Sequence, residues 1–163
     1  MTVALISVLA AISMFYIGDL MTNYRVRGGA RQVYVDMQTA RLNAIREGKV
    51  YAVEFVTSTT YCIKRRAGAT WDAGCDVGGE DTLDIISKTA DLSRDYSRVS
   101  ASFVCGAVAP GRAVFNPTGA AECAGTGSRV EVSAVKRDGT SQIQSLCVNT
   151  NTGNVRVVDG STC

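Results

Sequence analysis

The sequence predicts an α+β protein in which a long N-terminal helix, apolar in its first half and amphipathic in its second, packs on an antiparallel β-sheet domain. Three observations predict this fold class. Residues 1–17 carry no charge, residues 24–47 carry an apolar stripe at helical spacing, and the rest of the chain consists of short alternating runs separated by turn signals. The length of 163 residues suits one domain with a single core.

The first predicted element is an apolar helix. Residues 1–17 read MTVALISVLAAISMFYI, and their only polar side chains are small hydroxyls. Seventeen helical residues span about 26 Å, slightly less than the ~30 Å hydrocarbon core of a bilayer. A cleaved signal peptide would need a basic region before the apolar run, yet the first basic residue is Arg25. A buried core helix would usually carry more polar residues. We therefore expect residues 1–23 to form a transmembrane helix.

The helical pattern continues into the predicted globular part, residues 24–163. Residues 24–48 form an amphipathic helix whose apolar stripe is Val26, Ala30, Val33, Met37, Ala40 and Ala44. Gly28 and Gly29 weaken a helix by roughly 1 kcal/mol each, so we expect local bending there. Gly48 is a suitable residue to end the helix in the left-handed conformation.

Residues 49–163 are predicted to be a β-rich region. The last three strands should form an antiparallel meander, because Asp138–Gly139 and Thr152–Gly153–Asn154 are turn signals. The expected strands are residues 50–57, 59–64, 83–86, 99–104, 113–115, 129–135, 142–148 and 155–158.

The six cysteines indicate disulfides that stabilise the β-rich region. Many pairings are open, and local closure favours Cys62–Cys75, Cys105–Cys123 and Cys147–Cys163. Neither a zinc site nor a thioredoxin-like redox site is expected, because the chain has no C-x-x-C motif and no histidine.

Two features of the sequence disagree about which side of the membrane the segment after the apolar run occupies. Arg25, Arg27 and Arg31 follow the apolar run and would lie in the cytoplasm under the positive-inside rule. Disulfides persist only in an oxidising compartment, which places the same segment outside the cytoplasm. A basic leader upstream of Met1 would outweigh these arginines and remove the conflict.

The composition excludes several activities. Without histidine, a Ser-His-Asp or Cys-His catalytic group and an HExxH zinc site are impossible, and we predict no catalytic residue, metal or cofactor. A net charge of +2 does not indicate a polyanion-binding protein. Basic residues could still contact DNA locally, either near Tyr61, residues 64–66 and Trp71, or on the terminal strands. Arg129, Arg137 and Arg156 are the candidate DNA contacts there, and ordinary solvated surface is the competing interpretation.

Five segments resemble type IV pilin-like proteins, and the similarity is greatest to the minor pseudopilin H and FimT branch. They are residues 9–12 (LAAI), 24–32 (YRVRGGARQ), 40–48 (ARLNAIREG), 113–119 (AVFNPTG) and 153–157 (GNVRV). The chain departs from the family pattern because the leader, the N-methylated first residue and the early glutamate have no counterpart, so Met1 aligns a few residues inside the family's mature N-terminus. The proline that follows LAAI in the family is also replaced.

The resemblance implies a type IV pilin fold and a non-enzymatic structural subunit of a type IV pilus or a type II secretion pseudopilus. A minor or initiating subunit is favoured over a major pilin, and a DNA-binding pilin for DNA uptake is the alternative. The implied partners are other copies of the chain and other pilins or pseudopilins, after residence in the bacterial inner membrane with the globular domain in the periplasm. The helix residues expected in the filament core are Ala4, Leu5, Ser7, Leu9, Ala10, Ala11 and Ile12.

Overall fold

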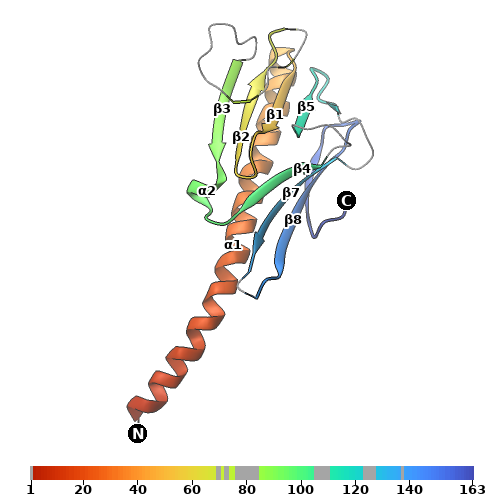
Figure 1. Ribbon diagram of the computed structural model, residues 1–163. Coiled ribbons are helices and arrows are strands. Elements are labelled where there is room, and N and C mark those ends of the chain that lie inside the picture. Colours follow the sequence, from red (N-terminus) through yellow and green to blue (C-terminus); the bar gives the residue numbers. More distant parts are fainter. Residues whose placement is uncertain are drawn as a thin grey trace.

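A computed structural model describes residues 2–68, 71, 74–75, 85–104, 111–122, 128–136 and 138–163, with side chains described from residue 20 onward. Helix α1 (Thr2–Glu47) is a single helix of 46 residues. Its N-terminal half projects from the molecule, and its C-terminal half lies against the β-rich part (Figure 1). The predicted fold class, a long helix packed on antiparallel β-structure, is confirmed.

The β-rich part contains two antiparallel sheets, where the sequence predicted one. The first has the strand order β3-β2-β1-β5-β6, and the second has the order β4-β7-β8-β9. The first sheet consists of β1 (Tyr51–Phe55), β2 (Thr60–Arg65), β3 (Ile85–Asp91), β5 (Arg112–Phe115) and β6 (Ala121–Glu122). The second consists of β4 (Ser100–Val104), β7 (Arg129–Val135), β8 (Ser141–Val148) and β9 (Val155–Asp159). The predicted meander is confirmed as β7-β8-β9.

Both sheets share one hydrophobic core with α1. The apolar stripe predicted on the helix is buried along its whole length, with each of its six residues at most 1% exposed. Strand residues from both sheets complete the core, among them Val53 and Phe115 from the first and Val132 and Leu146 from the second. Burial of this stripe therefore determines which side of the helix faces the domain.

The glycine pair of α1 has a packing role, and the helix continues through it without interruption. A Cβ on Gly28 would lie 2.5 Å from Cε1 of Tyr96, and one on Gly29 would lie 3.1 Å from Cγ1 of Val99. The absent side chains thus let the segment after helix α2 (Leu92–Asp95) approach the helix backbone. The prediction that Gly48 ends the helix is confirmed, because its φ is +63°.

Several strand boundaries were predicted wrongly, and the short strand β6 was not predicted. The largest difference is at the expected strand 83–86: its residues 85–86 begin β3, which extends to Asp91, while residues 83–84 lie outside the described part of the chain. β3 is an edge strand that pairs only with β2, and most of its side chains are exposed. An exposed edge strand lacks the apolar alternation by which strands are recognised, which explains the short prediction.

Among the residues that the structure describes, no helix has a stretch both long and apolar enough to cross a membrane. The predicted filament-core residues, from Ala4 to Ile12, belong to α1, but their side chains lie outside the described ones.

Candidate functional site

A buried carboxylate fixes α1 against the first sheet. Asp36 is 3% exposed, and it accepts hydrogen bonds from the Tyr61 hydroxyl at 2.7 Å and from Lys88 Nζ at 2.6 and 2.9 Å. Gln32, one turn earlier on the helix, donates a further hydrogen bond at 3.2 Å. Burial, followed by the hydrogen bond to Asp36, raises the pKa of Tyr61 far above its ordinary value, so its hydroxyl stays a donor. These contacts fix the rotation of α1 about its own axis and its position along that axis relative to the first sheet.

A second buried ion pair lies on the opposite face of the same sheet. Lys64 Nζ is 2.7 Å from Glu54 Oε2, and both side chains are almost completely buried. The Gly74 N–H donates a hydrogen bond of 3.2 Å to the other Glu54 oxygen. Cys62, directly opposite Glu54 in the β1–β2 register, forms a disulfide with Cys75. The disulfide and the hydrogen bond together hold residues 74–75 against this face.

These contacts correct the suggestion of a basic and aromatic DNA-binding surface around residues 61–71. Tyr61 faces the helix and Lys64 faces Glu54, so neither is accessible. Arg65 pairs with Glu47 at 3.3 Å. The neighbouring positions alternate between the two faces of β2, which is why residues adjacent in sequence do not share a surface.

Trp71 has a cationic neighbour on each of two segments. The guanidinium groups of Arg66 and Arg112 each lie 5.7 Å from the centre of a Trp71 ring. These cation–π contacts use the aromatic side chain for packing the loop onto the sheet.

Two of the three candidate DNA contacts, Arg129 and Arg156, lie in the same sheet. In the strand register, Arg129 on β7 and Arg156 on β9 both lie opposite Cys147 of β8, so the two arginines flank one residue on one face of the sheet. Arg129 Nε lies 2.6 Å from a Glu131 oxygen, which neutralises its charge locally. Arg137 lies outside the described residues.

Two of the three disulfides that local closure favoured are present. Cys147 on β8 is bonded to Cys163, in addition to the Cys62–Cys75 bond. The remaining pair, Cys105 and Cys123, lies outside the described residues. Within the described ranges, no cluster of three or more metal-ligating side chains exists.

The outward side of α1 is an exposed face with an unusual content of apolar residues. We define the outer helix face as Tyr24, Arg31, Val35 and Leu42, which recur at intervals of seven, four and seven residues. Tyr24 is 73% exposed, Val35 50% and Leu42 59%. This face lies opposite the buried stripe, so it is available for contact with another protein. Arg31 interrupts the apolar residues of this face, so the sequence pattern does not predict it.

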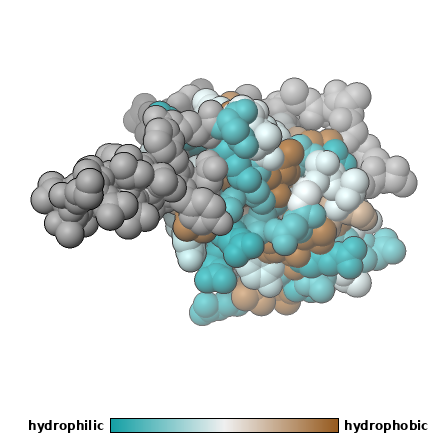
Figure 2. Space-filling model, turned by 90° about the horizontal axis from the view of Figure 1, so that it is seen from below, coloured by the Kyte–Doolittle hydropathy of each residue, from teal (hydrophilic) through white to brown (hydrophobic). Residues whose placement is uncertain are grey.

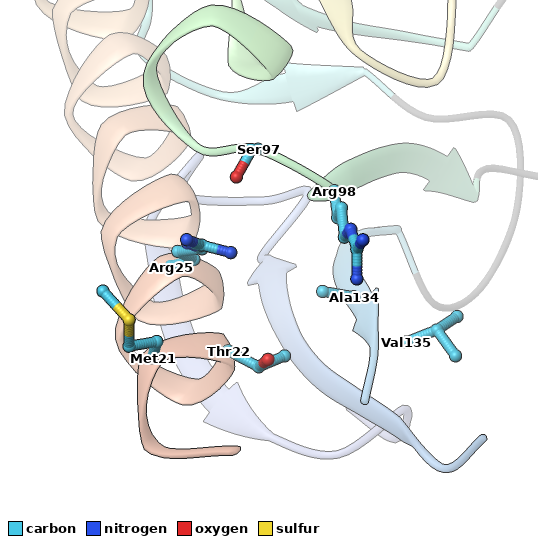
Figure 3. A pocket seen from close by; sticks show the side chains of 7 residues that line it. All are labelled: Met21, Thr22, Arg25, Ser97, Arg98, Ala134 and Val135. Atoms are coloured by element: carbon cyan, nitrogen blue, oxygen red, sulfur yellow. The ribbon is translucent and has the colours of Figure 1, made fainter. Parts of the chain in front are cut away.

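A pocket of about 330 Å³ lies where α1 enters the domain. Figure 3 shows it between the first domain-contacting turns of α1, the segment after α2 and the end of β7. Arg25 extends from the helix and Arg98 from the segment after α2, and both point toward this space. Met21, Thr22, Ser97, Ala134 and Val135 complete the lining.

These features define a pilin-like protein: a projecting helix, a disulfide-bonded β domain on its second half, and an exposed helix face. The sequence matches the family "Type II transport protein GspH" over residues 29–153, and the chain belongs to this pseudopilin family. The fold is similar to that of the minor pseudopilin EpsH from the type 2 secretion system of Vibrio cholerae. That match has a TM-score of 0.52 and 14% sequence identity, and it covers 83% of this chain and 97% of the other. No curated protein sequence matches the chain.

The family membership confirms the resemblance found in the sequence, and the family is one of structural subunits and not of enzymes.

Proposed function

We propose that the chain is a minor pseudopilin of a type II secretion system, which assembles with other pseudopilins through α1. The observation that carries this proposal is the form of α1, whose first half projects from the domain while its outer face stays exposed along the second half. The family match and the EpsH-like fold support the same function. The outer helix face, with its exposed apolar side chains, is the kind of surface that a neighbouring subunit covers.

Before assembly, residues 1–23 anchor the chain in the bacterial inner membrane and the domain lies in the periplasm. This part of the proposal rests on the uncharged run at residues 1–17 and on the disulfides, which require an oxidising compartment. In the filament, the same apolar side chains exchange lipid for neighbouring helices. Small residues such as Ala4, Ser7 and Ala11 would allow those helices to approach closely.

The test uses the outer helix face. A photo-crosslinking amino acid at position 42 should form adducts with other pseudopilins in cells, whereas the same group at Thr57, an exposed position in the β1–β2 turn, should not. Leu42→Asp should abolish secretion of the system's substrates, and Thr57→Asp should leave it unchanged. Normal secretion by Leu42→Asp, together with no adducts at position 42, would contradict the proposal.

The same strains separate the related functions. Loss of surface pili with normal secretion would favour a type IV pilus subunit. Measured stoichiometry in sheared filaments would distinguish a minor subunit from a major one, because a minor subunit should be far less abundant than the bulk filament protein.

DNA uptake is the less supported alternative, since Glu131 neutralises Arg129. It predicts binding of DNA at low salt that is lost when Arg129, Arg137 and Arg156 are replaced together by glutamine. An unchanged electrophoretic mobility of DNA at low salt would exclude it.

A further inference from the structure

The pocket between α1 and the end of β7 concentrates positive charge. Arg25 and Arg98 come from segments 73 positions apart in sequence, yet both line it. Neither forms an ion pair with any side chain that the structure describes, in contrast to Arg65 and Arg129. Two guanidinium groups that share a space without a described carboxylate favour an anionic ligand, and the planar guanidinium matches phosphate oxygens in a bidentate geometry.

The backbone at Arg98 is unusual. Among the described residues, Arg98 is the one non-glycine residue with a positive φ, at 67°. It occupies the third position of a turn closed by a hydrogen bond of 3.1 Å from the Val99 N–H to the Tyr96 carbonyl. Glycine or asparagine is the usual residue at such a position, since a longer side chain is strained there. Strain of this kind is found where a side chain has a function, and here the side chain that it orients lines the pocket.

The place of the pocket along α1 bears on the source of the anion. With residues 1–17 in the hydrocarbon core, Met21 lies four residues beyond Ile17, or about 6 Å at ~1.5 Å per residue, and Arg25 lies eight residues beyond it, or about 12 Å. The headgroup layer is about 5–7 Å thick on each side of a bilayer, so Met21 is at headgroup depth. The long Arg25 side chain reaches that layer by extending about 5 Å back toward the N-terminus, the direction in which helical side chains tilt. Figure 2 views the molecule from the side from which α1 projects, and hydrophilic side chains cover much of the described surface there.

We propose that this pocket, with Arg25 and Arg98 as its ligands, binds the headgroup of an anionic phospholipid before the subunit enters the filament. The inference rests on the proposed membrane anchor. Met21 and Val135, which are 52% and 60% exposed at the pocket, would contact the glycerol region of the same lipid. It also gives Arg25, one of the three arginines that follow the apolar run, a role on the side of the disulfide-bonded domain.

The experiment compares two lipids bound to the full chain. The chain is purified in a neutral detergent, supplied with equal amounts of phosphatidylglycerol and phosphatidylcholine, and examined by native mass spectrometry. The wild type should retain phosphatidylglycerol in preference, by roughly fivefold for each contributing arginine. The double variant Arg25→Gln/Arg98→Gln should retain both lipids equally. Arg46→Gln, which removes one arginine about 30 Å further along the same helix, should keep the wild-type preference.

Additional arms separate the sources of the anion. Inorganic phosphate at millimolar concentration should not displace phosphatidylglycerol; complete displacement would identify a free-phosphate site and overturn the proposal. Equal retention of the two lipids by the wild type would also overturn it. An unaltered lipid preference in Arg25→Gln/Arg98→Gln would overturn it too. If that variant had also lost crosslinking to other pseudopilins, the pocket would instead bind an acidic segment of a partner.

A separate experiment tests the proposed membrane anchor. Flotation of the full chain with vesicles of pure phosphatidylcholine tests the anchor alone. A chain that does not float contradicts both proposals, whereas one that floats without any preference for phosphatidylglycerol contradicts only the headgroup site.

Discussion

Arg41 of α1 donates a hydrogen bond of 3.0 Å from Nε to the carbonyl oxygen of Gly119, in the turn between β5 and β6. Gly153, before β9, lies against the same carbonyl, since a Cβ on it would be 1.9 Å from Gly119 O. Gly119 and Gly153 both have positive φ, at 81° and 64°. The three residues come from separate segments of the family resemblance, which therefore meet at one contact: residues 40–48, 113–119 and 153–157.

This contact predicts a large cost for a small substitution. Gly153→Ala should destabilise the protein by more than the ~1–3 kcal/mol expected from its positive φ alone, because the new methyl group also collides with the Gly119 carbonyl. Gly139→Ala is the matched control: its φ is +83°, but its Cβ would meet nothing within 4 Å. Urea unfolding of the full chain measures both. Equal losses in the two variants would show that the close approach has no energetic importance.

Removal of one donor to Asp36 should also be costly. Tyr61→Phe deletes the hydroxyl that bonds the buried carboxylate at 2.7 Å, and we expect a loss of about 1–3 kcal/mol in the free energy of unfolding. Tyr24→Phe deletes a hydroxyl from a side chain that is 73% exposed and should change stability by less than about 0.5 kcal/mol. The prediction fails if the two variants unfold at the same urea concentration.

Substitutions on the two faces of α1 should have different effects: those on the buried face should lower stability, and those on the outer helix face should weaken contacts between subunits. Met37→Ala empties a completely buried position and should cost about 2–5 kcal/mol of stability. Leu42→Ala, on the outer helix face, should leave stability within about 0.5 kcal/mol of the wild type and weaken crosslinking to other pseudopilins. Thermal unfolding and crosslinking yield, measured on the same samples, check both parts. A stable Met37→Ala variant would contradict the assignment of the core.

Removing one partner of the buried Glu54–Lys64 pair should lower the free energy of unfolding strongly, whereas replacing both partners with apolar residues should lower it little. Lys64→Met leaves the Glu54 carboxylate buried without its cation and should cost about 3–5 kcal/mol. Glu54→Leu/Lys64→Met removes both charges and should recover most of that loss. Chemical denaturation of the wild type and of both variants tests this. A double variant no more stable than Lys64→Met would show that the pair contributes through its specific geometry.

Acid should weaken the cap of α2. Asp91 accepts hydrogen bonds from the Ser93 hydroxyl at 2.7 Å and its N–H at 2.9 Å, and these bonds hold the pKa of Asp91 below its ordinary value of 3.8. A lowered pKa in the folded state means that the contribution is complete above the unfolded pKa and is lost as the pH falls through the folded value. Thermal unfolding of the wild type and Asp91→Ala should therefore differ at pH 6 and converge as the pH falls through the lowered pKa of Asp91. A difference that stays constant as the medium is acidified would contradict this assignment.

The long helix, its buried stripe and the terminal meander could all be predicted from the amino-acid sequence. These features follow from local periodicity and turn chemistry, which any short segment expresses without reference to the rest of the chain. The segments 40–48, 113–119 and 153–157 likewise sufficed to indicate the family, although nothing in their spacing showed that Arg41, Gly119 and Gly153 meet.

Which polar residues are buried, which helix face stays exposed and which arginines share a pocket depends on the packing of distant segments. Tyr61 and Lys64 are three positions apart on one strand, yet they face opposite sides of the sheet, toward Asp36 and Glu54 respectively. The glycine pair Gly28–Gly29 is typical of a flexible point in a helix, but Tyr96 and Val99 pack against it. Arg25 and Arg98 share a pocket because the chain returns to the helix after α2. Such contacts depend on where distant segments pack, and local patterns carry no information about that.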